Sequence, residues 1–200
     1  MADSMEIEKE NTEQTNPLWE ERYAVWCSLR FGSYSAKTAK LRVAKAFDHD
    51  SGHVICIPSG VSARTSRDEV SDDEMIWAKA LIDFFAGAAN PAVFLEDRTL
   101  SQVMSQDHIY EERYILFHHV HEIPWLFPGI QPTSRQIGIP FCFAVKFLPN
   151  SSKICSLRIY WDQASALKQI GCLPISHYCK SNDTEVILPT IGVNAADNLL

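Results

Sequence analysis

Two runs of β-branched and aromatic residues, separated by a polar break, form the clearest pattern in the chain. Residues 137–147 and 153–162 are rich in Ile, Phe, Val and Tyr, which are typical of β-strands. The break at 148–152 reads Leu-Pro-Asn-Ser-Ser, and Pro, Asn and Ser favour turns. This pattern predicts a β-hairpin. A short helix should follow at once, because Asp162 is a good N-cap and Gly171 would end the helix.

In three segments of the N-terminal half, apolar residues recur every three or four positions. The segments are 17–29, 37–47 and 73–86. Such spacing predicts amphipathic helices that turn one face toward a core. Residues 1–16 are rich in Glu, Asp, Thr and Asn, and we expect them to form a disordered lead-in.

Shorter apolar runs predict the remaining strands. A short strand is expected at 53–57, before Pro-Ser-Gly, and two longer strands are expected at 93–104 and 109–123. The polar segment 62–72 is expected to be a surface loop. Residues 124–136 contain three prolines and a glycine, so they should cross over the sheet rather than continue it.

The order of these elements predicts an α+β fold. Helices come first, a meander of antiparallel strands follows, and one short helix closes the pattern. Such an order suits a strongly curved antiparallel sheet wrapped around the N-terminal helices. Residues 17–174 are expected to form this domain and 175–200 a C-terminal extension. Within that extension, 186–188 is either a short strand or a packed extension.

Composition narrows the class of protein. The chain has 200 residues, 46% of them hydrophobic, and a formal net charge of -7, as expected for one globular domain with a substantial core. An acidic chain is a poor nucleic-acid binder. No apolar run is long enough to span a membrane, and the N-terminus is not a signal peptide. The six cysteines lack Cys-x-x-Cys spacing and are interpreted as reduced, mostly buried thiols of a cytoplasmic protein.

Three motifs carry a resemblance to a known family. Residues 119–133 read His-x-x-Glu-Ile-x-Trp-x-x-Pro-Gly-Ile-x-Pro-Thr, residues 139–141 read Ile-Pro-Phe, and residues 159–171 read Ile-Tyr-Trp-Asp-Gln-Ala-Ser-x-Leu-x-Gln-x-Gly. Over roughly residues 55–174 the chain resembles the SnoaL-type polyketide-cyclase branch of the nuclear-transport-factor-2-like superfamily. The resemblance implies a cone-shaped α+β barrel with a central pocket, usually dimeric. Some members cyclise or isomerise polyketide or terpenoid intermediates without a metal, and others have no known activity.

Strand alternation divides the last strand into two sets of side chains. An apolar set should pack beneath the helices: Cys155, Leu157, Ile159 and Trp161. A polar set would face a cavity or solvent: Ser156, Arg158, Tyr160 and Asp162.

Arg158 marks a departure from the family. Members usually have His-Glu-His at positions 156–158, where this chain has Ser-Leu-Arg. A guanidinium is always charged at neutral pH, so Arg158 cannot act as a base. With Tyr160 it would instead hold an oxyanion that develops on the substrate. An ion pair is the alternative, because buried charges are rarely left unpaired. The carboxylates considered for that pair are Glu111, Glu112 and Glu122.

Asp162 and His119 are the candidates for proton transfer. Asp162 would be a general base if a pocket desolvates it, and its role as an N-cap is an alternative that does not exclude the first. His119 would be an acid or base oriented by Glu112 or Glu122; a hydrogen-bonded sheet histidine is the alternative. Strict alternation turns Glu112 away from His119, unless a bulge intervenes near 118–119.

The same residues give little support for a metal. His119 and His121 share a strand face, but a third ligand would have to come from Glu111, a neighbouring strand or His53. No metal-binding spacing accompanies them. A glycine-rich phosphate loop is also lacking, so no organic cofactor is expected. Aromatic residues such as Trp125 are individually typical of a core, but several of them lining a pocket would suit a bulky apolar ligand.

Two functions are therefore considered. The first is a SnoaL-like isomerase or cyclase that acts by acid/base chemistry on a small hydrophobic polyketide or terpenoid intermediate in secondary-metabolite biosynthesis. It would be a cytoplasmic homodimer without cofactor. Asp162, His119 and Glu112 would be catalytic, and Arg158, Tyr160, Glu122 and Trp125 would bind the substrate. The alternative is a non-catalytic binding or scaffold protein of the same fold.

Overall fold

The structure, a computed structural model, describes most of the predicted strands and part of the predicted helices. The described residues are 17–30, 41–43, 45–48, 50–60, 62–64, 94–174, 176–179 and 184–187. The expected lead-in at 1–16 and the expected helix at 73–86 lie outside them. So do residues 37–40 of the second expected helix and 65–72 of the expected loop.

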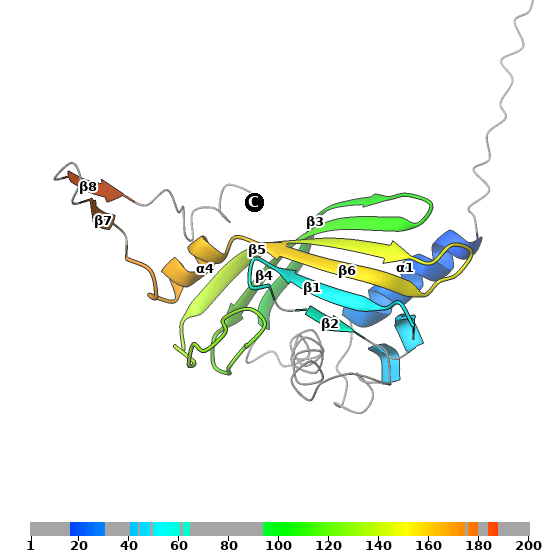
Figure 1. Cartoon of the computed structure of the whole chain (residues 1–200), viewed down its shortest axis with the longest axis horizontal. Coiled ribbons are helices and arrows are strands. Elements are labelled where there is room, and N and C mark those ends of the chain that lie inside the picture. Colours follow the sequence, from blue (N-terminus) through cyan, green and yellow to red (C-terminus); the bar gives the residue numbers. More distant parts are fainter. Residues whose placement is uncertain are drawn as a thin grey trace, which may run out of the picture.

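A six-stranded sheet with the strand order β2-β1-β6-β5-β4-β3 forms the body of the described chain (Figure 1). The strands are β1 (His53–Ile57), β2 (Ser62–Arg64), β3 (Phe94–Met104), β4 (His108–His118), β5 (Gln136–Phe147) and β6 (Ile154–Trp161). β3 to β6 form the predicted antiparallel meander. The mixed α+β class with a curved sheet is confirmed.

Two details of the predicted sheet are wrong. β1 runs parallel to β6, so the sheet is not wholly antiparallel. The sheet is also open among the described strands, with β2 and β3 at its edges, so it does not close into a barrel. The expected central pocket stays a prediction.

The hairpin and the short strand β1 agree with the sequence pattern. β5 and β6 pair in antiparallel register, and the turn between them places Asn150 at a φ of 54°, a backbone conformation that asparagine tolerates. β4 ends at His118 instead of continuing to Ile123, because the chain turns there and Val120 N donates to His118 O at 2.9 Å. Residues 124–135 lie outside the strands, as predicted.

Two short pairings complete the strand assignment. Ser62–Arg64 pairs with β1, although a loop was expected there; a short edge strand needs backbone pairing but no apolar alternation. β7 (Ser176–Cys179) pairs with β8 (Thr184–Ile187), which confirms the strand alternative at Val186 and Ile187.

Two helices lie at opposite ends of the sheet (Figure 1). α1 (Pro17–Arg30) confirms the first predicted helix. α4 (Gln163–Gln169) follows β6 directly, and the Asp162 side chain accepts from Ser165 N at its N-terminus. Gly171, at a φ of 81°, lies just beyond the end of α4, where a glycine tolerates the left-handed conformation. The cap predicted at Asp162 is thus confirmed.

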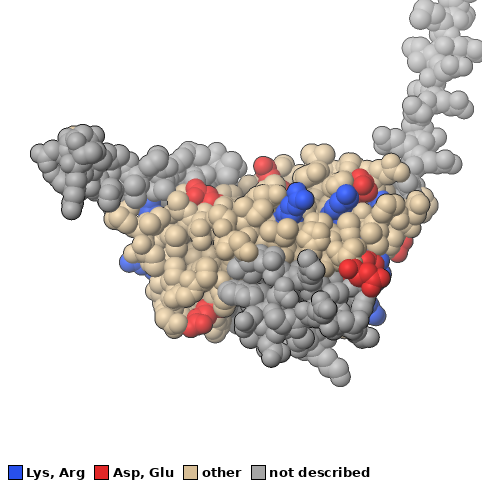
Figure 2. All heavy atoms as spheres, in the orientation of Figure 1, with Lys and Arg blue, Asp and Glu red and all other residues tan. Residues whose placement is uncertain are grey.

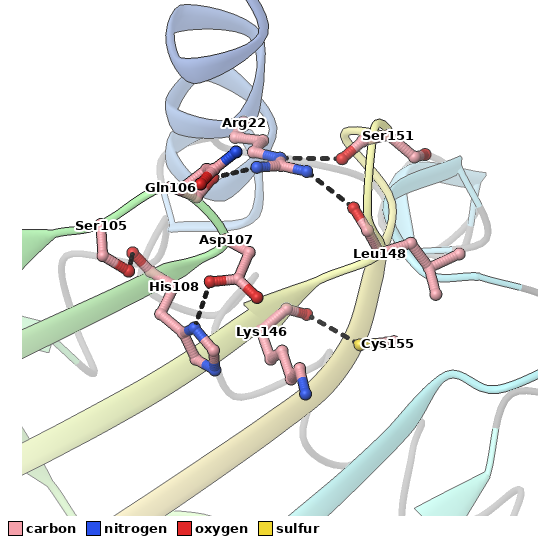
Figure 3. Close-up of polar contacts among 9 residues, drawn as sticks. All are labelled: Arg22, Ser105, Gln106, Asp107, His108, Lys146, Leu148, Ser151 and Cys155. Atoms are coloured by element: carbon pink, nitrogen blue, oxygen red, sulfur yellow. Dashed lines mark hydrogen bonds and ion pairs between the residues drawn. The ribbon is translucent and has the colours of Figure 1, made fainter.

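Arg22 joins α1 to two turns of the sheet (Figure 3). Its guanidinium donates to Ser151 O at 2.8 Å, to Leu148 O at 2.6 Å and to Gln106 O. The same group lies over the Phe147 ring, 5.5 Å from its centroid. Arg22 is only 4% exposed, so this buried cation is compensated by three carbonyl dipoles.

One face of the sheet forms the core. Along β4, alternate residues are buried: Ile109, Glu111, Arg113, Ile115 and Phe117. α1 covers part of this face, since the rings of Trp26 and Phe143 are 5.6 Å apart. Leu157, Ile159 and Trp161 are buried as well, as the alternation in the last strand predicts. Cys155, the fourth member of the predicted apolar set, is only half-buried.

The surface of the described residues carries mixed charge. On the face drawn in Figure 2, Lys and Arg side chains lie among Asp and Glu side chains. No helix among the described residues is long and apolar enough to cross a membrane.

The described cysteines are only partly buried. Five of them form no disulfide, and burial raises the pKa of the Cys56 thiol to about 12. Cys172 is exposed. The expectation of mostly buried thiols therefore holds for Cys56 alone among the described cysteines.

Candidate functional site

The buried face of the sheet contains a network of charged and polar groups. Glu111 is 0% exposed and Arg113 is 1% exposed. Glu111 Oε1 accepts from Thr99 Oγ1 at 2.9 Å, and Glu111 Oε2 accepts from the Trp26 indole. Arg113 Nη2 contacts Asp97, and its Nε lies 3.9 Å from Glu111 Oε1. Glu111, Arg113 and Asp97 thus each have an opposite charge beside them, which buried ions require.

Sequence analysis missed the importance of this network. Glu111 was considered as a partner of Arg158 and as a third metal ligand, and Arg113 was not singled out. The available signal was the alternation of β4, because Ile109, Ile115 and Phe117 must face the core and residues 111 and 113 share their face.

An aromatic cluster lies beside the charged network. Phe141 is opposite Arg113 on one side and opposite Trp161 on the other. Trp125 is fully buried, and its ring is 5.5 Å from Trp161 and 6.2 Å from Phe141. Trp125 belongs to the β4–β5 connection, which turns inward where Phe127 N donates to Ile123 O at 2.7 Å. Trp125 therefore lies in the interior, where it could contact an apolar ligand.

His119 is the second predicted site residue that the structure buries. Its side chain is 0% exposed, and its ring packs 5.2 Å from that of Phe127. Its backbone is fixed from both sides, because its N–H donates to Arg135 O and its carbonyl accepts from Ser134 N, each at 2.9 Å. Desolvation by burial lowers the pKa of His119. The imidazole is therefore neutral near pH 7.

Thr133 determines which nitrogen of His119 carries the proton. The Thr133 backbone N–H donates to Nδ1 at 3.4 Å, and Thr133 Oγ1 lies 3.2 Å from the same nitrogen. A backbone N–H can only donate, so Nδ1 is the acceptor and the proton of the neutral ring is on Nε2. Nε2 has no hydrogen-bond partner in the described part of the chain.

The remaining predicted residues do not join this interior. The expectation that Arg158 and Asp162 face an enclosed hollow is wrong, because both are exposed. Asp162 Oδ1 accepts from Ser165 N at 3.0 Å and Oδ2 from Ser165 Oγ at 2.5 Å. Tyr160 is half-buried. It shares one face of β6 with Arg158, and Trp161 lies on the other face. Glu111, one carboxylate considered for Arg158, lies on the buried face instead.

Neither glutamate proposed to orient the histidine is beside it. Glu112 is exposed and accepts from Ser101 Oγ at 2.9 Å. Glu122 is exposed and accepts from the Gln131 side chain. The β4–β5 register is unbroken from His108 to His118, so no bulge turns Glu112 inward. Thr133 occupies the position at Nδ1 that a carboxylate was expected to fill.

No metal-binding cluster occurs among the residues that the structure describes. No three His, Cys, Asp or Glu side chains within them are placed to hold one ion. His119 itself is surrounded by Phe127 and Thr133, neither of which offers a ligand of the kind zinc prefers.

Comparison with solved structures identifies the fold. No known family profile matches the chain, and no curated protein matches it. A candidate SnoaL-like polyketide cyclase from Jannaschia sp. CCS1 matches with a TM-score of 0.56 at 12% identity, over 81% of this chain and 99% of that chain. A phenazine biosynthesis-related protein from Pseudomonas aeruginosa matches with a TM-score of 0.51 at 12% identity, over 86% of this chain and 93% of that chain. The chain therefore has the curved α+β fold of the SnoaL-like proteins.

Proposed function

We propose that this chain is a cofactor-independent isomerase or cyclase for a hydrophobic polyketide or terpenoid intermediate of secondary metabolism. The observation that carries the proposal is His119, a buried and neutral imidazole near an aromatic-rich interior. The shared fold supports the same class, because the Jannaschia protein has a similar architecture. We propose that the protein works as a cytoplasmic homodimer and needs no metal.

His119 would act on a substrate carbonyl rather than as a base. The proton on Nε2 can be donated as a hydrogen bond to a carbonyl oxygen. This bond strengthens on enolisation, when a water molecule takes the proton from the neighbouring carbon and the oxygen gains charge. A neutral imidazole is suited to this role, since its N–H acts as an electrophile without a net charge in the interior. Surrounding apolar rings lower the local dielectric and strengthen the interaction.

The charged network would support this chemistry indirectly. Glu111 accepts from Trp26 of α1 and from Thr99 of β3, and Arg113 pairs with Asp97 of β3. These contacts hold α1 and the edge strand β3 in position. Pre-organised surroundings reduce the cost of aligning a substrate.

A non-catalytic binding protein of the same fold is the second candidate. It is favoured by the exposure of Arg158, Asp162 and Glu112, because exposed groups are poorly placed for chemistry in an enclosed site. Both carboxylate oxygens of Asp162 also accept hydrogen bonds from Ser165.

Solvent exchange separates the two candidates. The protein would be incubated in D2O with 1-tetralone, a minimal hydrophobic ketone, and deuterium uptake next to the carbonyl measured by mass spectrometry. Loss of one oxyanion donor typically reduces rate by about 10²–10³, so His119→Phe should slow the catalysed exchange by that factor. His108→Phe is the matched control, since His108 pairs with Asp107 outside this interior. Binding without accelerated exchange would favour the second candidate, and equal exchange by His119→Phe would refute the role of His119.

A further inference from the structure

His119 and Trp161 each bury an N–H donor for which the described part of the chain provides no acceptor. His119 is 0% exposed and Trp161 is 8% exposed. Among the described residues neither His119 Nε2 nor Trp161 Nε1 has a hydrogen-bond partner. They come from different elements, the β4–β5 connection and the end of β6, so they are independent features.

An unpaired buried donor is costly, because it has lost its water and gained nothing in return. The chain satisfies a comparable group elsewhere. Trp26 also carries a buried indole, and its N–H donates to the Glu111 carboxylate. The missing acceptors at His119 and Trp161 are exceptions of the kind that need an explanation in a folded chain.

We propose that the ligand supplies the missing acceptors through oxygen atoms at two separate positions. This inference rests on the proposed function and specifies its substrate class. The substrate carries ketone, ether or phenol oxygens and is not a bare hydrocarbon. A hydrocarbon skeleton would pack on the aromatic rings but would leave both donors unpaired.

The charges of the interior favour an uncharged ligand. Arg113 contacts Asp97 and lies near Glu111, so this guanidinium already has carboxylates beside it. A ligand carboxylate placed there would meet two negative side chains and one positive side chain, and burying it would be unfavourable. Carbonyl, ether and phenol oxygens accept hydrogen bonds without that cost.

The aromatic cluster fits the rest of such a ligand. Trp161 lies against Trp125 in an edge-to-face arrangement, with centroids 5.5 Å apart. Its ring is also 6.2 Å from that of Phe141. The indole N–H of Trp161 is therefore set at the margin of an apolar surface, where a ring system and its oxygen substituent can be bound together.

Matched probes test the inference. 1-Tetralone and tetralin share one carbon skeleton and differ by a carbonyl in place of a methylene group. Dissociation constants of both would be measured by calorimetry for the full chain, for His119→Phe, for Trp161→Phe and for the double variant. One good hydrogen bond corresponds to about a tenfold difference in affinity. Because tetralone has a single oxygen, it can accept from only one of the two donors at a time. We expect the protein to prefer tetralone about tenfold, the variant that lacks the donor bound to this oxygen to lower the preference, and the double variant to abolish it.

Nuclear magnetic resonance of the unaltered protein gives a second readout that does not depend on how the variants fold. Tetralone, but not tetralin, should shift the ¹⁵N resonance of His119 Nε2 or Trp161 Nε1. The Trp26 indole should not respond in this way, because Glu111 already accepts its proton. The inference is overturned by equal affinity for the two probes, by binding of neither probe, or by a preference that survives in the double variant. Preferential binding without deuterium exchange would leave it standing and reject only the catalytic proposal.

Discussion

Trp26 of α1 donates its indole N–H to Glu111 of β4, which lies 85 positions later in the chain. The other oxygen of the same carboxylate accepts from Thr99 on β3. One buried carboxylate thus connects the first helix, the edge strand and the centre of the sheet. Buried networks of this kind specify one arrangement of elements, because a shifted helix would leave a charge unpaired.

Replacing Trp26 with Phe should destabilise the fold. The variant removes the donor to Glu111 Oε2 and leaves a buried carboxylate oxygen unsatisfied, which typically costs about 1–3 kcal/mol. Urea unfolding measures this loss. Trp19→Phe is the control, because Trp19 is 37% exposed; it should change stability by less than about 0.5 kcal/mol. Equal effects of the two substitutions would show that the bond to Glu111 contributes nothing.

Arg22→Met should also destabilise the fold. Methionine keeps an apolar stem against Phe147 but cannot donate to Gln106 O, Leu148 O or Ser151 O (Figure 3). Hydrogen bonds from a charged donor contribute about 1.5–3 kcal/mol each but are not additive, so we expect a total loss of about 2–4 kcal/mol in urea unfolding.

Arg98→Met is the matched control for this change. Arg98 is exposed and pairs with Glu96 at 3.7 Å, and such surface pairs contribute little. Hydrogen exchange should moreover become faster in both hairpin turns of Arg22→Met. Unchanged exchange there would contradict the role of Arg22 in joining α1 to the turns.

Substitutions at Asp162 distinguish the cap from a catalytic role. Asp162→Ala removes both acceptors for Ser165 and should cost about 0.5–2 kcal/mol, whereas asparagine is as good an N-cap as aspartate. We therefore expect Asp162→Asn to keep both stability and deuterium exchange with 1-tetralone. If Asp162→Asn folds normally but loses deuterium exchange, Asp162 would be the catalytic base after all.

The sequence predicts which side chains share a face better than it predicts which face is covered. In β6, alternation correctly groups Leu157, Ile159 and Trp161, and all three are buried. The same pattern leaves open whether Arg158 faces a cavity or solvent. That choice depends on elements that are distant in the sequence, such as α1. The local pattern of a strand carries no information about its contacts with such elements.

The end of β4 shows the same limit. Residues 119–123 read His-Val-His-Glu-Ile and contain no Pro or Gly, so the prediction extends the strand to Ile123. The chain instead leaves the sheet after His118, and His119 bonds to the returning segment at Arg135. Local composition cannot reveal this pairing, because its partner is supplied by the far end of the connection. The hairpin of β5 and β6 is predictable because its turn residues are contiguous.

His119 should make the fold less stable in mild acid. Burial lowers its pKa in the folded state, while the unfolded chain has the ordinary value of about 6.5. As the pH falls through that value, the unfolded state binds more protons than the folded state, so the free energy of unfolding decreases. Above the unfolded pKa both states are neutral at this position and the contribution vanishes.

His119→Phe isolates this effect, because phenylalanine cannot titrate and can still pack against Phe127. Unfolding by urea would be measured between pH 5 and pH 8 for both proteins. The pair formed by Asp107 and His108 is present in both proteins, so its contribution to stability cancels in the comparison. We expect the unaltered protein to lose more stability than the variant between pH 7 and pH 5. Parallel pH profiles would mean that His119 is protonated equally in the folded and unfolded states, which would contradict a neutral imidazole held in the interior.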